Sequence, residues 1–188
     1  TLGHEVAGTI ETLGEGVHTY KVGDRVLVVA GERNEKNQIT TLGFDYDGGY
    51  AEYVIAKAGL LVKIPDSLPF EEAAIIPDAV STPWAAISST AKMKSGETAA
   101  VFGVGGLGIH AVQLLKIVGC GKVIAIDPRP EARSKALEIG ADFAFDPSDE
   151  ELKKHRGLNA AFDFAGVTPV RKQALSMLGE QGRLVIVG

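Results

Sequence analysis

The stretch Thr98-Ala-Ala-Val-Phe102, followed at once by Gly103-Val-Gly-Gly-Leu-Gly108, decides the fold of this 188-residue chain. The first five residues are a continuous apolar run, which predicts a strand buried on both faces. A helix is predicted to follow from Gly106 to Val118. Glycines spaced G-x-G-x-x-G between a strand and a helix are typical of a dinucleotide-binding turn, whereas the same spacing without that context means little.

Each glycine of this fingerprint has a separate physical task. Gly103 permits the tight turn, Gly105 lets the backbone approach a pyrophosphate, and Gly108 allows the helix to pack closely on the strand. The helix N-terminus adds unpaired N–H groups and a positive dipole end. The candidate cofactor contacts are Gly103, Val104, Gly105, Gly106, Leu107 and Gly108.

Asp127 closes the next predicted strand, Val123–Ile126, at the distance where an acidic residue meets the adenosine ribose. Its carboxylate would accept from the 2′- and 3′-hydroxyls and repel a 2′-phosphate, which favours NAD over NADP. Alternatively, Asp127 only caps the turn before Pro128. Arg129 complicates the choice of cofactor, because an arginine there could neutralise a 2′-phosphate.

The rest of the second half repeats the strand–helix alternation. A parallel sheet covered by helices on both faces is therefore predicted for 81–188, the doubly wound α/β arrangement called a Rossmann fold, with five of its usual six strands. The further expected strands are Phe143–Phe145, Ala160–Phe164 and Leu184–Val187. The further expected helices are Pro130–Ile139, Ser148–Arg156 and Pro169–Leu178.

Residues 1–80 have a different character and are expected to form part of a β-rich domain. Short segments rich in Val, Ile and Tyr are separated by glycine turns. The expected strands are Val6–Thr12, Asp24–Ala30, Tyr50–Ala56 and Leu61–Ile64. Gly31–Thr41 is polar and aperiodic, which predicts an exposed loop, and Pro69 with two acids after it predicts a helix start.

Composition narrows the classes of function. A net charge of −5 argues against nucleic acid as a partner. No apolar run approaches the roughly 20 residues of a membrane helix, so no membrane segment is expected. The single cysteine, Cys120, suits a reducing, cytoplasmic compartment. Because the chain opens at Thr1 within a motif and stops at Gly188 after a strand, we expect a central piece of a longer protein.

Three blocks carry a family resemblance: Thr1-Leu-Gly-His-Glu-Val6, Lys21-Val-Gly-Asp-Arg-Val26 and Asp47-Gly-Gly-Tyr-Ala-Glu-Tyr53. In this order, and ahead of the glycine fingerprint, they resemble the zinc-dependent alcohol dehydrogenase branch of the medium-chain dehydrogenase/reductase superfamily. The likeness covers essentially the whole chain. It implies a partial GroES-like catalytic domain before the Rossmann domain.

The resemblance implies a site at which metal and cofactor meet. His4 would be a ligand of a catalytic zinc, and Glu5 a neighbouring or exchangeable ligand. Asp78 takes the place of a cysteine ligand, and carboxylate oxygen is acceptable to zinc. Thr82 matches a threonine beside the nicotinamide. Since Gly31–Thr41 contains no cysteine, one catalytic zinc and no structural zinc are expected.

The function implied is hydride transfer between NAD and a small alcohol, such as a secondary alcohol, or a polyol. A small alcohol or carbonyl compound is the expected partner, and the full-length protein is expected to form a homo-oligomer. One alternative is a zinc-independent quinone or enoyl reductase that uses NADPH, and another is a nucleotide-binding module without catalysis. For single residues, Asp78 could be only a helix N-cap, and Glu5 only a structural carboxylate.

Overall fold

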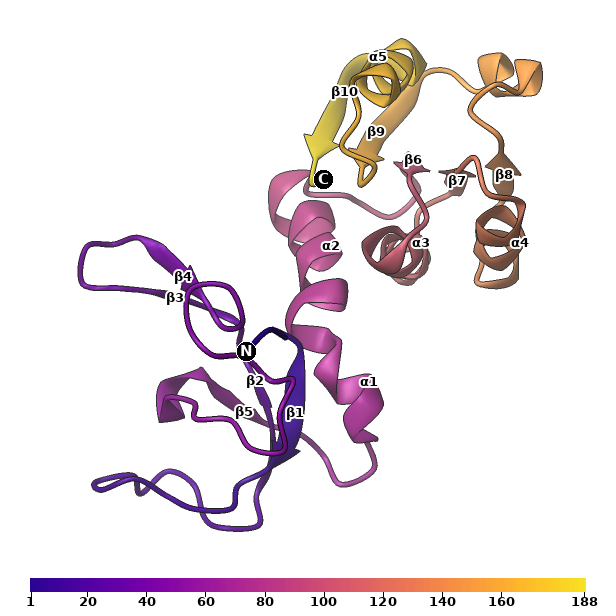
Figure 1. The fold of residues 1–188 in the computed structure, drawn as a ribbon. Coiled ribbons are helices and arrows are strands. Elements are labelled where there is room, and N and C mark those ends of the chain that lie inside the picture. The colour runs from indigo at the N-terminus through magenta and orange to yellow at the C-terminus, as the bar shows by residue number, and fades with distance from the viewer. The chain divides into compact units, whose positions relative to one another are not determined.

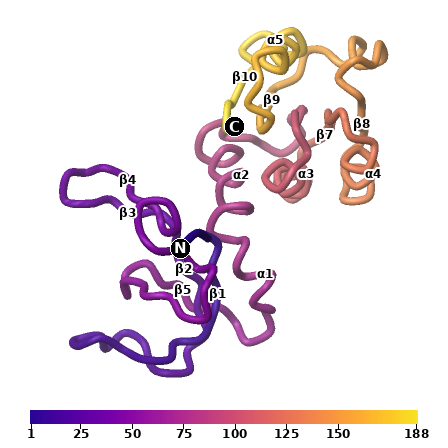
Figure 2. Tube along the Cα trace, in the orientation of Figure 1, coloured from indigo at the N-terminus to yellow at the C-terminus, as the bar shows by residue number.

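The computed structural model describes residues 1–188, which form two compact units, Thr1–Asp78 and Ala79–Gly188. Figure 2 follows the chain through both units, from indigo at Thr1 to yellow at Gly188. Each unit is built around its own sheet. None of the helices combines the length and the apolar character that crossing a bilayer requires.

The first unit is built on a small antiparallel sheet with the strand order β1-β2-β5. Its strands are β1 (Val6–Thr9), β2 (Arg25–Val28) and β5 (Leu61–Lys63), which begins directly after a 3₁₀ turn, η1 (Ala58–Leu60). Helix α1 (Phe70–Ala74) closes the core by packing Ala73 against Leu27 and Ile64. The three predicted strands in this sheet are present, each somewhat shorter than expected.

Two predictions for the first unit are wrong. Gly31–Thr41 is a hairpin of β3 (Gly31–Arg33) and β4 (Ile39–Thr41), because Asn34 accepts from the N–H groups of Lys36 and Gln38 and Asn37 adopts a φ of 61°. Tyr50–Ala56 is not a strand. Its β-forming residues meet no strand of this chain in a ladder, and local propensity alone does not make a strand.

Prolines divide the helical segment after α1 into short pieces. A π-helical turn, η2 (Ile76–Val80), precedes α2 (Ser81–Ala85), and a second one, η3 (Ala86–Thr90), follows it. Pro77 and Pro83 each lack the N–H that would continue the regular i→i−4 ladder. The wider π-helical turns are a local response to such interruptions, and they occur frequently at functional sites.

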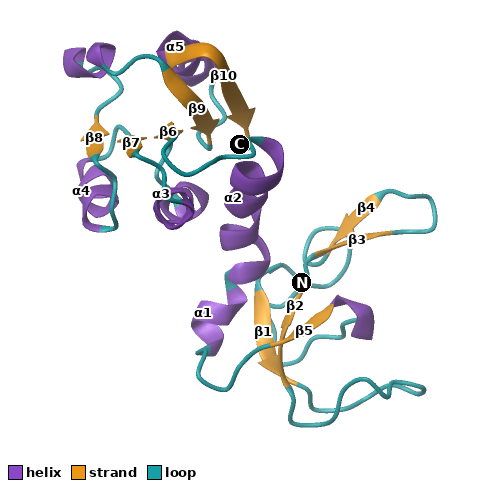
Figure 3. Ribbon diagram, turned by 180° about the vertical axis from the view of Figure 1, so that it is seen from behind, coloured by secondary structure: helices purple, strands orange, loops and turns teal.

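The second unit contains the predicted five-stranded parallel sheet, in the order β10-β9-β6-β7-β8. Helices α3 and α4 lie on one face and α5 on the other, as Figures 1 and 3 show from opposite sides. The strands are β6 (Thr98–Phe102), β7 (Lys122–Ile126), β8 (Phe143–Phe145), β9 (Leu158–Asp163) and β10 (Leu178–Ile186), and the helices are α3 (Gly106–Val118), α4 (Pro130–Glu138) and α5 (Thr168–Met177). The doubly wound prediction is confirmed.

Side-chain alternation along the central strands fills a core on each face. Ala99 and Val101 of β6 face α3, whereas Ala100 and Phe102 face α5. All four are essentially fully buried, which explains why the strand reads as an unbroken apolar run. One helix prediction here needs correction, because Ser148–Arg156 contains only a 3₁₀ turn, η4 (Glu150–Lys154).

His155, directly after this turn, predicts a pH effect on stability. Its ring lies 4.7 Å from that of Phe143 and 5.0 Å from that of Phe145, and burial, with a contribution from Lys122, lowers the pKa of His155. The unfolded chain, with a histidine pKa of about 6.5, binds the proton more readily, so folding stability falls as the pH drops below about 6.5.

Melting temperatures at pH 7 and pH 5 test this effect. His155→Gln should reduce the loss of stability on acidification, and Lys122→Gln should reduce it partly, since it removes one cause of the lowered pKa. An unchanged difference between the two pH values in His155→Gln would show that His155 is not responsible.

Candidate functional site: a donor pair and a dinucleotide cleft

The structure brings together two of the predicted metal ligands, His4 and Asp78, within the first unit. Nε2 of His4 lies 3.0 Å from Oδ2 of Asp78 although the two residues are 74 positions apart. Both side chains are about one third exposed, so the pair can be reached from solvent. The ring of Phe44 lies 5.2 Å from the His4 imidazole and forms an apolar, 73% exposed wall beside it.

Glycines position His4. Gly3 has a φ of +100°, a conformation that favours glycine, and its carbonyl accepts from the N–H of Gly49 at 2.8 Å. A Cβ at Gly48 would collide with the same carbonyl oxygen. The glycines of the first and third family blocks therefore allow their backbones to touch, and this contact fixes the chain on the N-terminal side of His4.

Asp78 is the third residue of the π-helical turn η2. The alternative that Asp78 is only the N-cap of the following helix is wrong, because Val80 occupies the N-cap position of α2. Instead, the wider turn carries its carboxylate to His4. A π-helical turn that presents a side chain in this way is common where a residue is needed for function.

The chemistry of the donor pair fits a zinc ion. Imidazole nitrogen and carboxylate oxygen both bind zinc at about 2.0–2.2 Å, and two such donors in a tetrahedral site lie about 3.3 Å apart. The observed 3.0 Å is close to that spacing. The third predicted ligand, Glu5, is half-buried. No three His, Cys, Asp or Glu side chains in the chain form a group that could hold a metal ion. This chain thus contributes a two-donor pair.

In the second unit, the glycine fingerprint forms the predicted turn between β6 and α3. Gly103 has a φ of +83°, and a Cβ there would lie 3.0 Å from the backbone nitrogen of Ala165. A Cβ at Gly108 would collide with the carbonyl oxygen of Gly103. At Gly105 and Gly106, by contrast, a Cβ would meet nothing within 4 Å. The loop is therefore tightly packed against the protein at Gly103 and Gly108, and it has open space beside Gly105 and Gly106.

A cleft of about 450 Å³ lies along this open side, at the carboxyl ends of β6, β7 and β9. The strand order reverses between β6 and β9, and open α/β sheets bind their ligands at such a switch point. The cleft is lined by Phe102, Gly103, Gly105, Gly106, Leu107, Gly108, Ile126, Asp127, Pro128, Arg129, Pro147, Phe164, Ala165 and Val170. Val104, also predicted as a contact, is buried beneath the loop.

Asp127 lies at one end of this cleft with its carboxylate almost completely buried. It does cap its turn, since Oδ1 accepts from the N–H of Arg129 at 2.9 Å, and Oδ2 accepts from the N–H of Val104 at 2.8 Å. Burial alone would raise the pKa of Asp127, but hydrogen bonds from Arg129 and Val104 outweigh it and lower that pKa. The carboxylate is therefore ionised at neutral pH.

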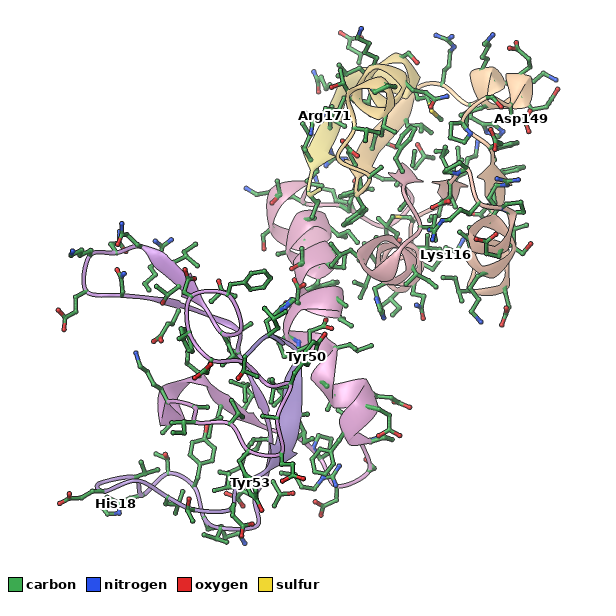
Figure 4. The ribbon with its side chains drawn as sticks, in the orientation of Figure 1. His18, Tyr50, Tyr53, Lys116, Asp149 and Arg171 are labelled. Atoms are coloured by element: carbon green, nitrogen blue, oxygen red, sulfur yellow. The ribbon has the colours of Figure 1, made fainter.

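The sequence interpretation missed the opposite wall of the cleft. Asp163, fully buried at the end of β9, accepts from the N–H groups of Ala165 and Gly166 and from Nε of Arg171 at 3.2 Å. Arg171 comes from α5 and is labelled in Figure 4. This network shapes the turn that carries Phe164 and Ala165 into the cleft. The signal in the sequence that could have revealed this network is Asp163, a charged residue inside the apolar run Ala160–Phe164.

Thr82 is half-buried in α2 and belongs to the second unit, as the cleft residues do. The structure therefore divides the predicted site residues between its two units. His4, Glu5 and Asp78 lie in the first, and Thr82, the fingerprint and Asp127 lie in the second.

Known protein families match the sequence of both units. Residues 1–66 match the family model of the alcohol dehydrogenase GroES-like domain, and residues 106–188 match that of the zinc-binding dehydrogenases. The (R,R)-butanediol dehydrogenase of Bacillus subtilis is 36% identical over 203 residues, with 100% of this chain and 58% of that enzyme covered. An alcohol dehydrogenase of Geobacillus stearothermophilus is 36% identical, with 99% of this chain and 60% of that enzyme covered.

The crystal structure of the 2R,3R-butanediol dehydrogenase from Bacillus subtilis matches the fold with a TM-score of 0.88 at 35% identity, covering 99% of this chain and 57% of that one. The chain thus spans less than two thirds of the length of these relatives. The GroES-like fold expected for the first unit is confirmed. With both domain families present in this order, the chain belongs to the zinc-dependent alcohol dehydrogenase branch of the medium-chain dehydrogenase/reductase superfamily.

Proposed function

We propose that the protein containing this chain is a zinc-dependent alcohol dehydrogenase that transfers hydride between NAD and a small alcohol or polyol. The observation that carries the proposal is the 3.0 Å approach of the His4 imidazole to the Asp78 carboxylate. An imidazole nitrogen and a carboxylate oxygen held this close together form a zinc-compatible donor pair. We assign catalysis to a domain of residues 1–80 and cofactor binding to residues 81–188.

Each group of residues has a distinct role in this proposal. His4 and Asp78 would hold the ion, with Glu5 as a neighbouring carboxylate. A bound zinc supplies Lewis acidity that lowers the pKa of an alcohol group. The open backbone at Gly105 and Gly106 would receive the pyrophosphate at the N-terminus of α3. Thr82 would lie beside the nicotinamide and orient it.

Metal content and turnover of the full-length protein test the proposal. We expect about one zinc per chain, together with NAD-dependent oxidation of small alcohols or polyols. Asp78→Asn, which keeps the shape of the side chain but removes its charge, should lose most of the metal. Asp66→Asn, at an exposed position of the same unit, is the matched control and should retain it.

Two outcomes would overturn this function. A metal-free protein that oxidises NADPH with a quinone or enone would be a zinc-independent reductase. A metal-free protein that binds the cofactor but shows no turnover would be a nucleotide-binding module.

The preference for NAD rests on Asp127 and has its own test. Asp127→Ala should weaken NAD binding about tenfold to a hundredfold, because hydrogen bonds to a charged acceptor contribute about 1.5–3 kcal/mol. The same change should relax discrimination against NADP, since it removes the charge that repels a 2′-phosphate. Fluorescence titrations with NADH and NADPH give both dissociation constants. An unchanged ratio of the two would show that Asp127 is not the ribose contact.

A further inference from the structure

Arg129 covers the carboxylate that the proposed function assigns to the ribose. Its Nε donates to Oδ1 of Asp127 at 3.0 Å and its Nη2 donates to Oδ2 at 3.0 Å, so the guanidinium spans both oxygens. Nη2 also reaches the carbonyl oxygen of Val104 at 3.3 Å. The side chain of Asp127 is only 3% exposed beneath it. Arg129 therefore closes the carboxylate off from the cleft.

The hydrogen-bonding capacity of Asp127 is already filled. An ionised carboxylate has about four acceptor sites. Oδ1 accepts from the backbone N–H and the Nε of Arg129, and Oδ2 accepts from the N–H of Val104 and from Nη2 of Arg129. No site is left for a ribose hydroxyl. Because the two backbone donors belong to the turns themselves, only the Arg129 side chain can make room.

Arg129 is also the group that can move. Its side chain is 54% exposed, so its charge is readily hydrated when it leaves the carboxylate. The neighbouring Arg133 differs, because its side chain is only 23% exposed and its Nη1 donates at 2.8 Å to the carbonyl oxygens of Asp127 and Pro128. Arg133 supports the backbone of the turn, whereas Arg129 only covers the carboxylate.

We infer that Arg129 is a displaceable latch on Asp127 that weakens NAD binding and reduces discrimination against NADP. This inference rests on the cofactor site of the proposed function. A cofactor with a free 2′-hydroxyl must displace the guanidinium before its ribose reaches the carboxylate. A cofactor with a 2′-phosphate would meet the displaced guanidinium, and arginine pairs well with phosphate.

Direct binding of NADH and NADPH to the full-length protein tests the latch without any need for turnover. In Arg129→Ala, we expect NADH to bind about threefold to tenfold more tightly and NADPH about tenfold more weakly, because a competing bidentate pair and a phosphate partner are both lost. In Arg129→Lys, the NADH gain should persist and the NADPH loss should be smaller, since lysine keeps the charge but lacks the planar fork.

Lys135→Ala is the matched control for the lost charge. Lys135 lies on the adjacent helix α4 and pairs with Glu138 rather than with Asp127, so its removal should change neither dissociation constant. NADH binding that is unchanged or weaker in Arg129→Ala would overturn the latch. Failure of both the unmodified protein and Arg129→Ala to bind either cofactor would overturn the latch together with the cofactor site. Tighter NADH binding in a protein without alcohol turnover would support the latch and overturn only the dehydrogenase proposal.

Discussion

Replacing His4 with alanine is expected to abolish alcohol oxidation by the full-length protein. We expect kcat/KM to fall by at least about a thousandfold, because loss of the ion removes several kcal/mol of transition-state stabilisation and about 1.4 kcal/mol corresponds to a factor of ten. The physical reason is the donor pair. Without the imidazole, the carboxylate of Asp78 is the only remaining member of the pair. Steady-state kinetics with metal analysis of the same sample measures both effects.

Binding of NADH distinguishes this effect from loss of the cofactor site. His4 belongs to the first unit and the dinucleotide cleft to the second, so the dissociation constant for NADH should change by no more than a few fold. His18→Ala is the control, because His18 is an exposed histidine of the first unit, labelled in Figure 4, and lies outside the donor pair. Full turnover in His4→Ala would refute the zinc mechanism.

Replacing Gly108 with alanine is expected to disrupt the dinucleotide loop and to destabilise the second unit. A methyl group at this position collides with the carbonyl oxygen of Gly103, and backbone on both sides leaves little freedom to relax. Forcing extra volume into a packed contact costs about 1–3 kcal/mol or more. We expect a melting temperature several degrees lower and NADH binding weakened by about a hundredfold or more, since the loop must separate from the helix.

Gly106→Ala is the matched control for stability. Gly106 is the first residue of α3, in the same fingerprint, but a Cβ there meets nothing within 4 Å. Its melting temperature should remain close to that of the unmodified protein. If Gly108→Ala were as stable as Gly106→Ala, the result would show that the fingerprint does not need a glycine at 108 for close packing against Gly103.

Local sequence pattern predicted most of the second unit. Strand β6, the glycine turn and helix α3 follow one another without interruption, and the structure has β6 and α3 with the predicted bounds. Apolar runs of five residues predict buried strands because both faces of a parallel sheet are covered. The same kind of reasoning failed for Tyr50–Ala56, where β-forming residues have no partner strand in this chain. A strand needs a neighbour, and propensity does not supply one.

The sequence by itself determined the class of fold and the position of the glycine fingerprint, because each is written in consecutive residues. The candidate donors His4, Glu5 and Asp78 came from the resemblance to a known family. Only the structure decided that His4 and Asp78 meet across 74 positions, and that the Arg129 guanidinium takes the two acceptor sites of Asp127 that backbone N–H groups leave open. It also decided that a π-helical turn, rather than a helix cap, holds Asp78. The His4–Asp78 contact depends on how separate segments pack, and no local periodicity encodes that packing. The Arg129–Asp127 contact is local, but the sequence does not fix the side-chain conformation that makes it.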